Sequence, residues 1–434
     1  NRIVACKGAP EGIIRNSGLT DDQQKIVLGK VQEAATKGLR VLAVAESEWT
    51  GGEFPKDQHE LPLKFLGLVG FYDPPKENIR EVFDQFNEAG IQLKIITGDN
   101  AFTTEAIACQ AGFRHADQLS DGGDLMKLDD SEFDKQCLRT FLFTRMYPEA
   151  KLRVIQSLKK QNHIVAMTGD GVNDGPALKA AHIGIAMGKR GTEIAKQAAS
   201  LIITDDNLGK MIAAIAMGRK IYANLKKAIQ YIISIHIPIV LTVSIPLLLG
   251  WIFPNIFSPV HVIFLELIMG PTCSIIYENE PLEKNSMRQP PRQLTQTFLN
   301  WRELSLSLIQ GLAITAGTLG CYQWAIHQGY SEPLTRSMVF ITLVSANIML
   351  TLVNRSFYYS LIASFRARNP LLVWMIIITL GLLIAVLYIP LFARFFTMQS
   401  PEPMQALTAA LLGILSVVWF EFYKWVKRVR HPIA

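Results

Sequence analysis

The second half of the sequence consists of long apolar runs, which constrain the fold more strongly than any other feature. After Lys220, apolar stretches follow one another with only short polar loops between them. A helix that crosses the hydrocarbon core of a bilayer needs about 20 apolar residues. The runs therefore predict six membrane-spanning helices, at 226–250, 257–278, 303–327, 336–354, 370–393 and 404–424. Up to Gly218 the sequence is instead dense in Lys, Asp and Glu, which predicts a soluble head.

Positive charge gathers in alternate loops of the apolar half. The cations lie after the second span, after the fourth span and in the tail: Lys284, Arg288, Arg292 and Arg302; Arg355, Arg366 and Arg368; Lys424, Lys427, Arg428 and Arg430. The turn at 251–260, between the first two spans, carries no charge. Because cytoplasmic loops are enriched in Lys and Arg, this pattern predicts a cytoplasmic head and cytoplasmic ends of the span region. We expect an integral, multi-pass protein of the plasma (inner) membrane.

The remaining composition excludes several classes of protein. The net charge of +6 is not arranged as a basic stripe interleaved with aromatic residues, so we predict no nucleic-acid partner. The five cysteines are scattered and odd in number. They indicate neither a metal site nor a disulfide framework, as is usual in a reducing cytoplasm. The first six residues read as a strand entered in the middle of a domain, so we expect an amino-terminal portion to precede them.

Short apolar strands alternate with helices in the head. An opening strand, a helix at 21–37 and a strand at 40–45 come first, followed by a stretch with Gly and Pro at 51–62. The pattern then becomes regular, with strands at 65–71, 93–96, 141–145 and 164–167 and helices at 79–89, 103–112 and 150–161. This alternation predicts an α/β fold with a parallel sheet covered on both faces. In such sheets the chemistry lies at the carboxyl ends of the strands.

The most informative segment follows the last of these strands. It reads Met-Thr-Gly-Asp-Gly-Val-Asn-Asp-Gly-Pro-Ala-Leu from residue 167 to residue 178. The carboxylates of Asp170 and Asp174 and the amide oxygen of Asn173 are hard ligands of the kind that Mg²⁺ prefers. The glycines allow the backbone to approach a phosphate, and the amino terminus of the following helix favours anions. Such residues also form ordinary turns, but a position directly after a strand favours a magnesium and phosphate site.

Two further segments carry groups suited to phosphate. Thr97-Gly98-Asp99 ends a neighbouring strand, where a hydroxyl and a backbone amide can hold phosphoryl oxygens. The alternative for this triplet is a plain turn between a strand and a helix. Lys151 opens the helix at 150–161, and its cation can offset charge on a transferred phosphate. The alternative for Lys151 is a solvated surface lysine.

Taken together, these segments resemble the phosphorylation domain of P-type ATPases, which has a haloacid-dehalogenase-like fold. The resemblance extends to shorter motifs: Asp73-Pro74-Pro75 at the entry to that domain, and Lys7-Gly8-Ala9-Pro10-Glu11 and Gly38-Leu39-Arg40-Val41-Leu42 of the nucleotide-binding domain. It covers nearly the whole chain and is nearest to the calcium- and sodium-pump branch. It implies part of an α/β nucleotide-binding domain at 1–65, a phosphorylation domain at 66–215 and an all-α, six-helix cation-transport domain at 216–434.

The resemblance also implies roles for individual residues. The catalytic residues that it implies are Thr97, Gly98, Asp99, Lys151, Asp170, Asn173 and Asp174. Among them Asp170 would bind magnesium, with Asp174 a weaker ligand. Lys7 and Arg40 would contact ATP. The implied cofactors are ATP and Mg²⁺, and the implied partners are a transported cation and membrane lipid; the sequence identifies no accessory subunit.

One departure from the family pattern bears on activity. The nucleophilic aspartate of the family lies in an Asp-Lys-Thr-Gly-Thr motif, and these 434 residues do not contain that motif. The Thr-Gly-Glu loop of the family's actuator domain and the first four spans are also absent. Since an aspartyl-phosphate intermediate needs its nucleophile, we expect the chain to be inactive alone. The alternative of another class is a truncated, non-catalytic membrane partner or regulator.

Polar residues inside the apolar runs indicate the path of the cargo, because such groups are costly in a bilayer and usually functional. Glu266 lies in the second span, before Gly270-Pro271-Thr272, where the proline frees backbone carbonyls that can coordinate a cation. We expect a buried carboxylate there, either at a cation site or kept neutral beside a neighbouring helix. His236 in the first span suits packing or transport equally. Calcium is the first expectation for the ion, and a proton or a monovalent cation is the alternative.

Overall fold

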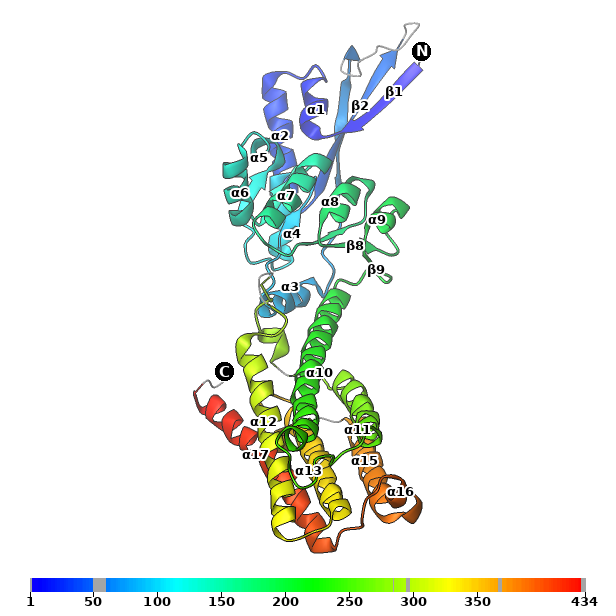
Figure 1. Ribbon diagram of the computed structural model, residues 1–434. Helices are drawn as coiled ribbons and strands as arrows, with labels where there is room; N and C mark the ends of the chain where they lie inside the picture. The colour runs from blue at the N-terminus through cyan, green and yellow to red at the C-terminus, as the bar shows by residue number, and fades with distance from the viewer. Residues whose placement is uncertain (1, 50–59, 284, 294–296, 366–368, 431–434) are drawn as a thin grey trace. The chain divides into compact units, whose positions relative to one another are not determined.

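The computed structural model describes residues 2–49, 60–283, 285–293, 297–365 and 369–430 (Figure 1). Most of the stretch at 51–62 and three of the loop cations, Lys284, Arg366 and Arg368, lie outside the described residues. The chain divides into two compact units. The head unit comprises residues 1–214 and 287–294, and the helical unit comprises residues 215–286 and 295–434.

The head unit begins with an antiparallel sheet. Its strands are β1 (Arg2–Gly8), β2 (Arg40–Trp49) and β3 (Lys64–Phe71), in the order β1-β2-β3. Between β1 and β2 the chain forms α1 (Pro10–Arg15) and α2 (Asp21–Thr36). A capping box between Thr20 and Gln23 fixes the start of α2. The buried side chains of this sheet and of α1 form a small core that includes Ile13, Ala43 and Ala45.

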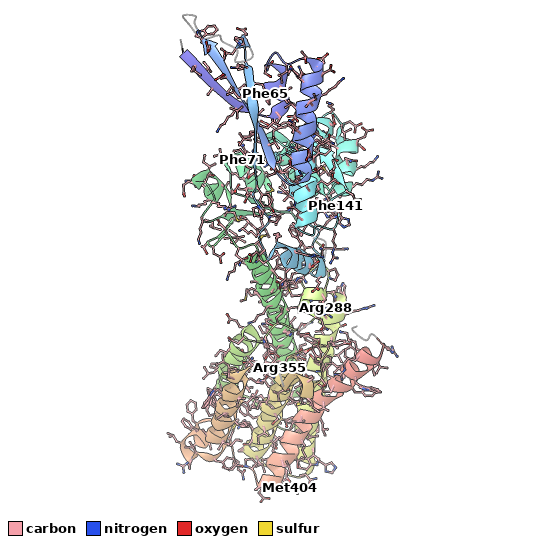
Figure 2. The ribbon with its side chains drawn as sticks, turned by 180° about the vertical axis from the view of Figure 1, so that it is seen from behind. Phe65, Phe71, Phe141, Arg288, Arg355 and Met404 are labelled. Carbon is pink, nitrogen blue, oxygen red and sulfur yellow. The ribbon has the colours of Figure 1, made fainter. Side chains whose placement is uncertain are left out.

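The strand predicted at 65–71 exists, but its placement in the parallel sheet was wrong. β3 pairs antiparallel with β2, and its Phe71 lies opposite Arg40 (Figure 2). An apolar run indicates a strand but neither its direction nor its partner, because tertiary pairing decides both. β3 therefore completes the first sheet, and the parallel part of the head begins after it.

Two parallel sheets form the rest of the head unit, which confirms the predicted fold class. One contains β4 (Ile95–Ile96), β5 (Leu119–Asp121) and β6 (Leu142–Thr144) in the order β4-β6-β5. The other contains β7 (Ala166–Gly169), β8 (Ile183–Met187) and β9 (Leu201–Ile203) in chain order. Both sheets contribute to one core, since Phe143 of β6 and Met167 of β7 belong to the same cluster of buried side chains.

Helices alternate with these strands along the chain. They are α3 (Ile79–Glu88), α4 (Ala101–Gln110), α5 (Gly122–Leu125), α6 (Asp130–Arg139), α7 (Pro148–Lys160), α8 (Gly175–Ala180) and α9 (Glu193–Ala198), with a 3-10 turn, η2 (Val172–Asp174), before α8. The helices α3, α4 and α7 confirm the three predicted from the sequence. The helix predicted to follow the loop is α8, which begins at Gly175, directly after the 3-10 turn and within the 167–178 segment.

A left-handed turn follows β9. Asp206 has a φ of 57°, and its carboxylate accepts hydrogen bonds from the backbone amides of Lys189 and Arg190, both at 3.0 Å. These bonds favour the ionised form and lower the pKa of Asp206. An unfolded chain, whose Asp titrates near pH ~4, therefore binds more protons than the folded one at acid pH. The carboxylate thus stabilises the fold fully above about pH 4, and this contribution is lost as the pH falls further.

We expect Asp206→Asn to destabilise the protein at neutral pH and to matter less in acid. Asparagine tolerates the left-handed backbone and keeps one acceptor oxygen, so the change removes the charge and one of the two accepted hydrogen bonds. Thermal unfolding of both proteins, followed from about pH 7 down to about pH 3, should show the difference narrowing below about pH 4. Asp117→Asn, at an exposed position, is the control. A difference that stays constant over this range would contradict the assignment.

The helical unit contains the predicted spans. Its helices are α10 (Gly209–Leu248), which starts in the head unit, α11 (Pro259–Pro271), α12 (Trp301–His327), α13 (Glu332–Val353), α14 (Leu361–Phe365), α15 (Pro370–Tyr388), α16 (Pro390–Phe395) and α17 (Pro403–Arg430). Five of them, α10, α12, α13, α15 and α17, are long and apolar enough to cross a membrane. They correspond to five of the six predicted spans.

The second predicted span is a helix whose winding changes along its length. α11 ends at Pro271 and a π-helical turn, η3 (Thr272–Tyr277), follows directly. The apolar α-helical part before the π-helical turn is too short to count among the five long helices. Proline lacks an N–H and clashes with the carbonyl four residues earlier, which explains the change of winding at this point. The helix thus departs from α-helical winding at the predicted proline but is not interrupted there, and π-helical turns of this kind occur frequently at functional sites.

α13 and α17 approach each other closely at a glycine. A Cβ at Gly413 would lie 2.3 Å from the carbonyl oxygen of Thr342 and 3.0 Å from the amide nitrogen of Ala346. The Thr342 hydroxyl also donates a hydrogen bond to the carbonyl of Ala409, at 3.0 Å. Small residues permit this close packing of helices in membranes.

Gly413→Val should therefore destabilise the helical unit by about 2 kcal/mol, because the added carbons force the two helices apart. Gly381→Val on α15 is the matched control, since a Cβ there would meet nothing within 4 Å. Thermal unfolding in detergent measures both. Equal losses in the two variants would contradict the close approach at Gly413.

Candidate functional site

The loop after β7 brings the predicted magnesium residues together. β7 ends at Gly169, Asp170 follows, and η2 contains Asn173 and Asp174. The loop folds back so tightly that a Cβ at Gly169 would lie 2.6 Å from the Cβ of Asp174. Only glycine fits at this point, which explains its place between Thr168 and Asp170.

Asp174 and Lys151 form a nearly buried ion pair. Lys151 Nζ lies 2.7 Å from Asp174 Oδ1, and the two side chains are 12% and 11% exposed. The other carboxylate oxygen of Asp174, Oδ2, accepts a hydrogen bond from the Gly171 amide at 3.3 Å. Because Lys151 belongs to α7, the pair ties that helix to the loop after β7. The alternative of a solvated surface lysine is thereby excluded.

Asp170 and Asn173 present oxygens to solvent from the same loop. Both side chains are exposed, and the Asp170 carboxylate makes no hydrogen bond to another described residue. Lys151 already neutralises Asp174, so Asp170 is the carboxylate available to a cation. Among the described residues, no three His, Cys, Asp or Glu side chains are grouped to hold a metal. The loop fits magnesium, which proteins bind through one or two carboxylates together with substrate phosphates and water.

Thr97, Gly98 and Asp99 form a compact turn at the end of β4. The Thr97 hydroxyl accepts a hydrogen bond from the Asp99 amide at 3.1 Å and donates to Asp99 Oδ2 at 3.2 Å. The backbone of Thr97 bonds to the carbonyl of Phe143 and to the amide of Met146, both at 2.9 Å. These bonds hold the turn at the carboxyl end of β4, where a parallel sheet places its chemistry.

Two arginines link this part of the head to the antiparallel sheet and its helix α1. Arg40 Nε lies 3.3 Å from Asp99 Oδ1. Arg145, which no sequence pattern indicated, lies 3.2 Å from Glu11 and 3.8 Å from Asp121. Its φ of 50° is in the left-handed region that non-glycine residues rarely occupy, and such strain clusters at functional sites. Arg145 and Glu11 are 134 positions apart, so periodicity and short motifs could not reveal the contact.

Lys7 stands apart from these residues. It is exposed on β1, opposite Val44 of β2, and among the described residues no hydrogen bond or ion pair joins it to the other candidates. The predicted residues thus form two groups in the head unit: Lys151 with the loop at 170–174, and Arg40 with the turn at 97–99.

The two residues predicted for transport contact each other in the helical unit. His236 Nε2 of α10 lies 3.1 Å from Glu266 Oε1 of α11, and His236 Nδ1 lies 2.8 Å from the carbonyl of Ile232. The expectation that Glu266 is buried is wrong for the described part of the chain, because its side chain is 43% exposed and that of His236 is 47% exposed. A nearly uniform apolar run has no polar and apolar faces, so it cannot predict which of its positions are covered.

A buried ion pair in the helical unit has no sequence signal of its own. Arg355 Nε lies 2.8 Å from Glu280 Oε1, with side chains 2% and 5% exposed, and the Asn369 amide donates to the same oxygen at 2.8 Å. Lys424 was counted among the tail cations, but it is fully buried and donates to the carbonyls of residues 353, 356 and 359. The sequence does not distinguish a charged residue that faces solvent from one that donates hydrogen bonds to backbone carbonyls near a helix end.

Comparison with known proteins gives matches in both units. Residues 12–182 match the haloacid dehalogenase-like hydrolases, and residues 254–426 match the family described as cation transporting ATPase, C-terminus. The chain is 31% identical to calcium-transporting ATPase type 2C member 1 of Bos taurus, over 99% of this chain and 45% of the relative. Calcium-transporting ATPase 1 of Bacillus cereus is 28% identical, over 94% and 48%. A cation-transporting ATPase of Synechocystis is 33% identical, over 80% and 40%.

The parallel sheets with their loop at 168–176, and the apolar helices, define an integral membrane protein with a haloacid-dehalogenase-like domain. With relatives aligned along nearly its whole length, the chain belongs to the P-type cation-transporting ATPases. It spans about half the length of the curated relatives it matches.

Proposed function

We propose that this chain takes part in ATP-driven transport of a cation across a membrane. The observation that carries the proposal is the loop at 168–176, which contains both the exposed Asp170 carboxylate and the partner of Lys151, Asp174. An arrangement of this kind, with a cation and oxygen ligands at the carboxyl end of a parallel strand, suits phosphoryl transfer. Calcium is the first candidate for the ion, because relatives that align along the whole chain are named as calcium-transporting ATPases.

In this proposal ATP and Mg²⁺ are the cofactors. Mg²⁺, when bound, supplies positive charge to the phosphate oxygens. Asp170 holds the metal, Asn173 adds an amide oxygen, and Asp174 acts mainly by fixing Lys151 and the loop. Because Lys151 is held within 2.7 Å of a carboxylate, its ammonium group is oriented before substrate binds.

The turn at the end of β4 has a second role in the same proposal. The Thr97 hydroxyl and the Gly98 amide hold phosphoryl oxygens, and Asp99 fixes the hydroxyl through the bonds described above. Arg40 and Lys7 contact ATP. Their positions on β2 and β1 place both on the antiparallel sheet, so nucleotide binding involves a different part of the head from the metal loop.

We propose further that an aspartate outside these 434 residues accepts the phosphate, since the Asp-Lys-Thr-Gly-Thr motif is not among them. The unpaired sides of β4 and β7 support the proposal of a further strand that carries this aspartate. Among the described residues β4 pairs with β6 alone and β7 pairs with β8 alone, although both sheets share one core. Strands of a parallel sheet normally pair on both sides and avoid open edges. One further strand bonded to both would bring its carboxyl end to Thr97 and Asp170.

The cation is proposed to pass near Glu266 and His236. A pair of polar, ionisable side chains is costly when it faces lipid, so the half-exposed pair is expected to face protein or water in the complete transporter. The π-helical turn at 272–277 directly follows the α-helix that contains Glu266 and departs from regular α-helical hydrogen bonding. A histidine beside the carboxylate suits a proton or monovalent cation as the alternative cargo.

Glu266→Gln should leave phosphorylation by ATP intact but abolish the stimulation of ATP hydrolysis by the transported ion. The amide keeps the shape and the contact with His236 but removes the charge that holds a cation. ATP hydrolysis by the full-length protein, measured against ion concentration, reports the effect. Glu402→Gln, at an exposed carboxylate before α17, is the control. Unchanged ion stimulation would remove Glu266 from the transport path.

The topology completes the proposal. The head and both ends of the helical unit lie in the cytoplasm of a cell whose plasma (inner) membrane holds the transporter, in line with the loop cations. An ion screen tests the function: full-length protein in sealed vesicles is given ATP and Mg²⁺ with Ca²⁺, Na⁺, K⁺ or a pH gradient as the variable. Uptake of one ion coupled to ATP hydrolysis supports the proposal. Absence of hydrolysis with every ion would favour the non-catalytic partner instead.

A further inference from the structure

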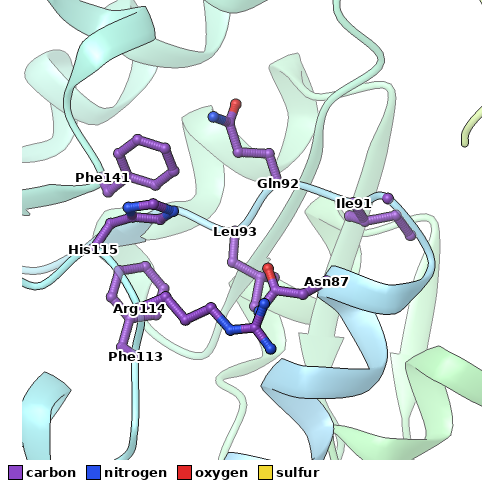
Figure 3. A pocket seen from close by; sticks show the side chains of 9 residues that line it. Asn87, Ile91, Gln92, Leu93, Phe113, Arg114, His115 and Phe141 are labelled. Carbon is purple, nitrogen blue, oxygen red and sulfur yellow. The ribbon is translucent and has the colours of Figure 1, made fainter.

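A pocket of about 230 Å³ lies in the head unit, away from the candidate site (Figure 3). Its wall includes Leu93, which precedes β4, and Phe141, which precedes β6. The pocket therefore lies at the amino ends of these parallel strands. Thr97 follows the carboxyl end of β4, so the pocket and the turn at 97–99 lie at opposite ends of this strand.

Three aromatic side chains belong to the lining of the pocket: Phe113, His115 and Phe141. Phe113 is buried and packs edge-to-face against Phe83, with ring centroids 5.6 Å apart. The rings of His115 and Phe141 lie 4.2 Å apart and are tilted by 34°, side by side at one wall (Figure 3). Aromatic walls of this kind accept a flat, apolar ligand body by stacking and edge contacts.

Arg114 is the charged residue that lines the pocket, and no Asp or Glu is among the described residues of its lining. Arg114 is paired with Asp84 at 2.8 Å, but the two side chains are 57% and 47% exposed. Exposed pairs are weak, so the guanidinium can turn to a ligand at little cost. A guanidinium binds the two oxygens of a carboxylate or sulfonate with matching geometry.

We propose that this pocket binds a small organic anion with an aromatic body, an aryl carboxylate or sulfonate. The body lies against Phe113 and Phe141, and the anionic group is held by Arg114. Residues 290 and 291 pack against the pocket wall. A Cβ at Gly90, which lines the pocket, would lie 3.2 Å from Pro290 Cα and 3.0 Å from Pro291 Cδ. A bound ligand is therefore separated by one residue from the segment that joins η3 to α12.

Fluorine NMR of para-trifluoromethylbenzoate with the full-length protein in detergent tests the proposal. We expect saturable binding to the unaltered protein. Arg114→Gln should weaken it at least about tenfold, because a hydrogen-bonded charge is lost. Leu93→Trp should abolish it by filling the pocket. Arg139→Gln, at an exposed position at the end of α6, should change nothing.

The neutral analogue para-trifluoromethylbenzamide separates the pocket from the detergent, because it has the same body without the charge. It should bind at least about tenfold more weakly than the benzoate. If Leu93→Trp fails to fold, Arg114→Gln and the benzamide decide the question, since Arg114 is at the surface. Equal binding of benzoate and benzamide, equal binding to the Arg114→Gln protein, or no saturable binding overturns the proposal.

Discussion

Asp170→Asn in the full-length protein is expected to lower the rate of ATP hydrolysis by at least about a hundredfold, with the thermal stability nearly unchanged. Asp170 is the exposed carboxylate of the loop at 168–176, and it makes no hydrogen bond through its side chain to another described residue. The folded state therefore loses no internal contact, and surface changes of this kind hardly alter stability. The catalytic loss is expected because the proposed magnesium site loses its charged ligand.

ATP hydrolysis measured against magnesium concentration tests whether the lost activity is due to weaker metal binding. The Asp170→Asn protein should need more Mg²⁺ for its residual activity, whereas Asp117→Asn, another exposed aspartate of the head, should behave like the unaltered protein. Normal turnover and normal magnesium dependence in Asp170→Asn would remove the loop from the proposed site.

Lys151→Met is expected to have the largest combined effect. It leaves Asp174, a side chain 11% exposed, without its 2.7 Å partner. Breaking a buried pair on one side typically costs about 3–5 kcal/mol, because the remaining charge stays desolvated. We therefore expect a clear drop in the unfolding temperature together with loss of ATP hydrolysis. Asp174→Leu should be destabilising for the same reason, with an unpaired ammonium group left behind.

The double variant Lys151→Met/Asp174→Leu separates folding from chemistry. Removing both charges should restore at least half of the stability lost in either single variant, since apolar replacements of buried pairs are often neutral. Hydrolysis should stay lost, because both proposed roles are gone. If the three variants lose stability additively, the ion pair is not the interaction that holds α7 to the loop. If the double variant hydrolyses ATP normally, neither residue acts in the reaction.

Much of the head could be predicted because its signals are local. The alternation of apolar strands with helices indicated the parallel fold, and the helices α3, α4 and α7 lie within a few residues of their predicted bounds. The position of the 168–176 loop could also be predicted, because it directly follows a short apolar run that indicates a strand. Gly169 and its 2.6 Å approach to Asp174 show why this segment has so specific a sequence.

The features that the sequence missed all depend on tertiary contacts. β3 is a strand as predicted, but its antiparallel pairing with β2 joins it to residues from another part of the chain. Arg145 depends on Glu11, and Lys424 depends on the carbonyls at the end of α13 and in the segment after it. The exposure of Glu266 has a similar origin, because burial in a uniformly apolar helix is decided by its neighbours.

The most direct test of the account is whether ATP phosphorylates the full-length protein through the loop at 168–176. Radiolabelled ATP and Mg²⁺ should give an acid-stable label that hydroxylamine removes, as an acyl phosphate requires. The label should be absent, or fixed and unable to turn over, in the Asp170→Asn protein. An unaltered protein that takes up no label, or an Asp170→Asn protein that forms and hydrolyses the label at the normal rate, would contradict the account.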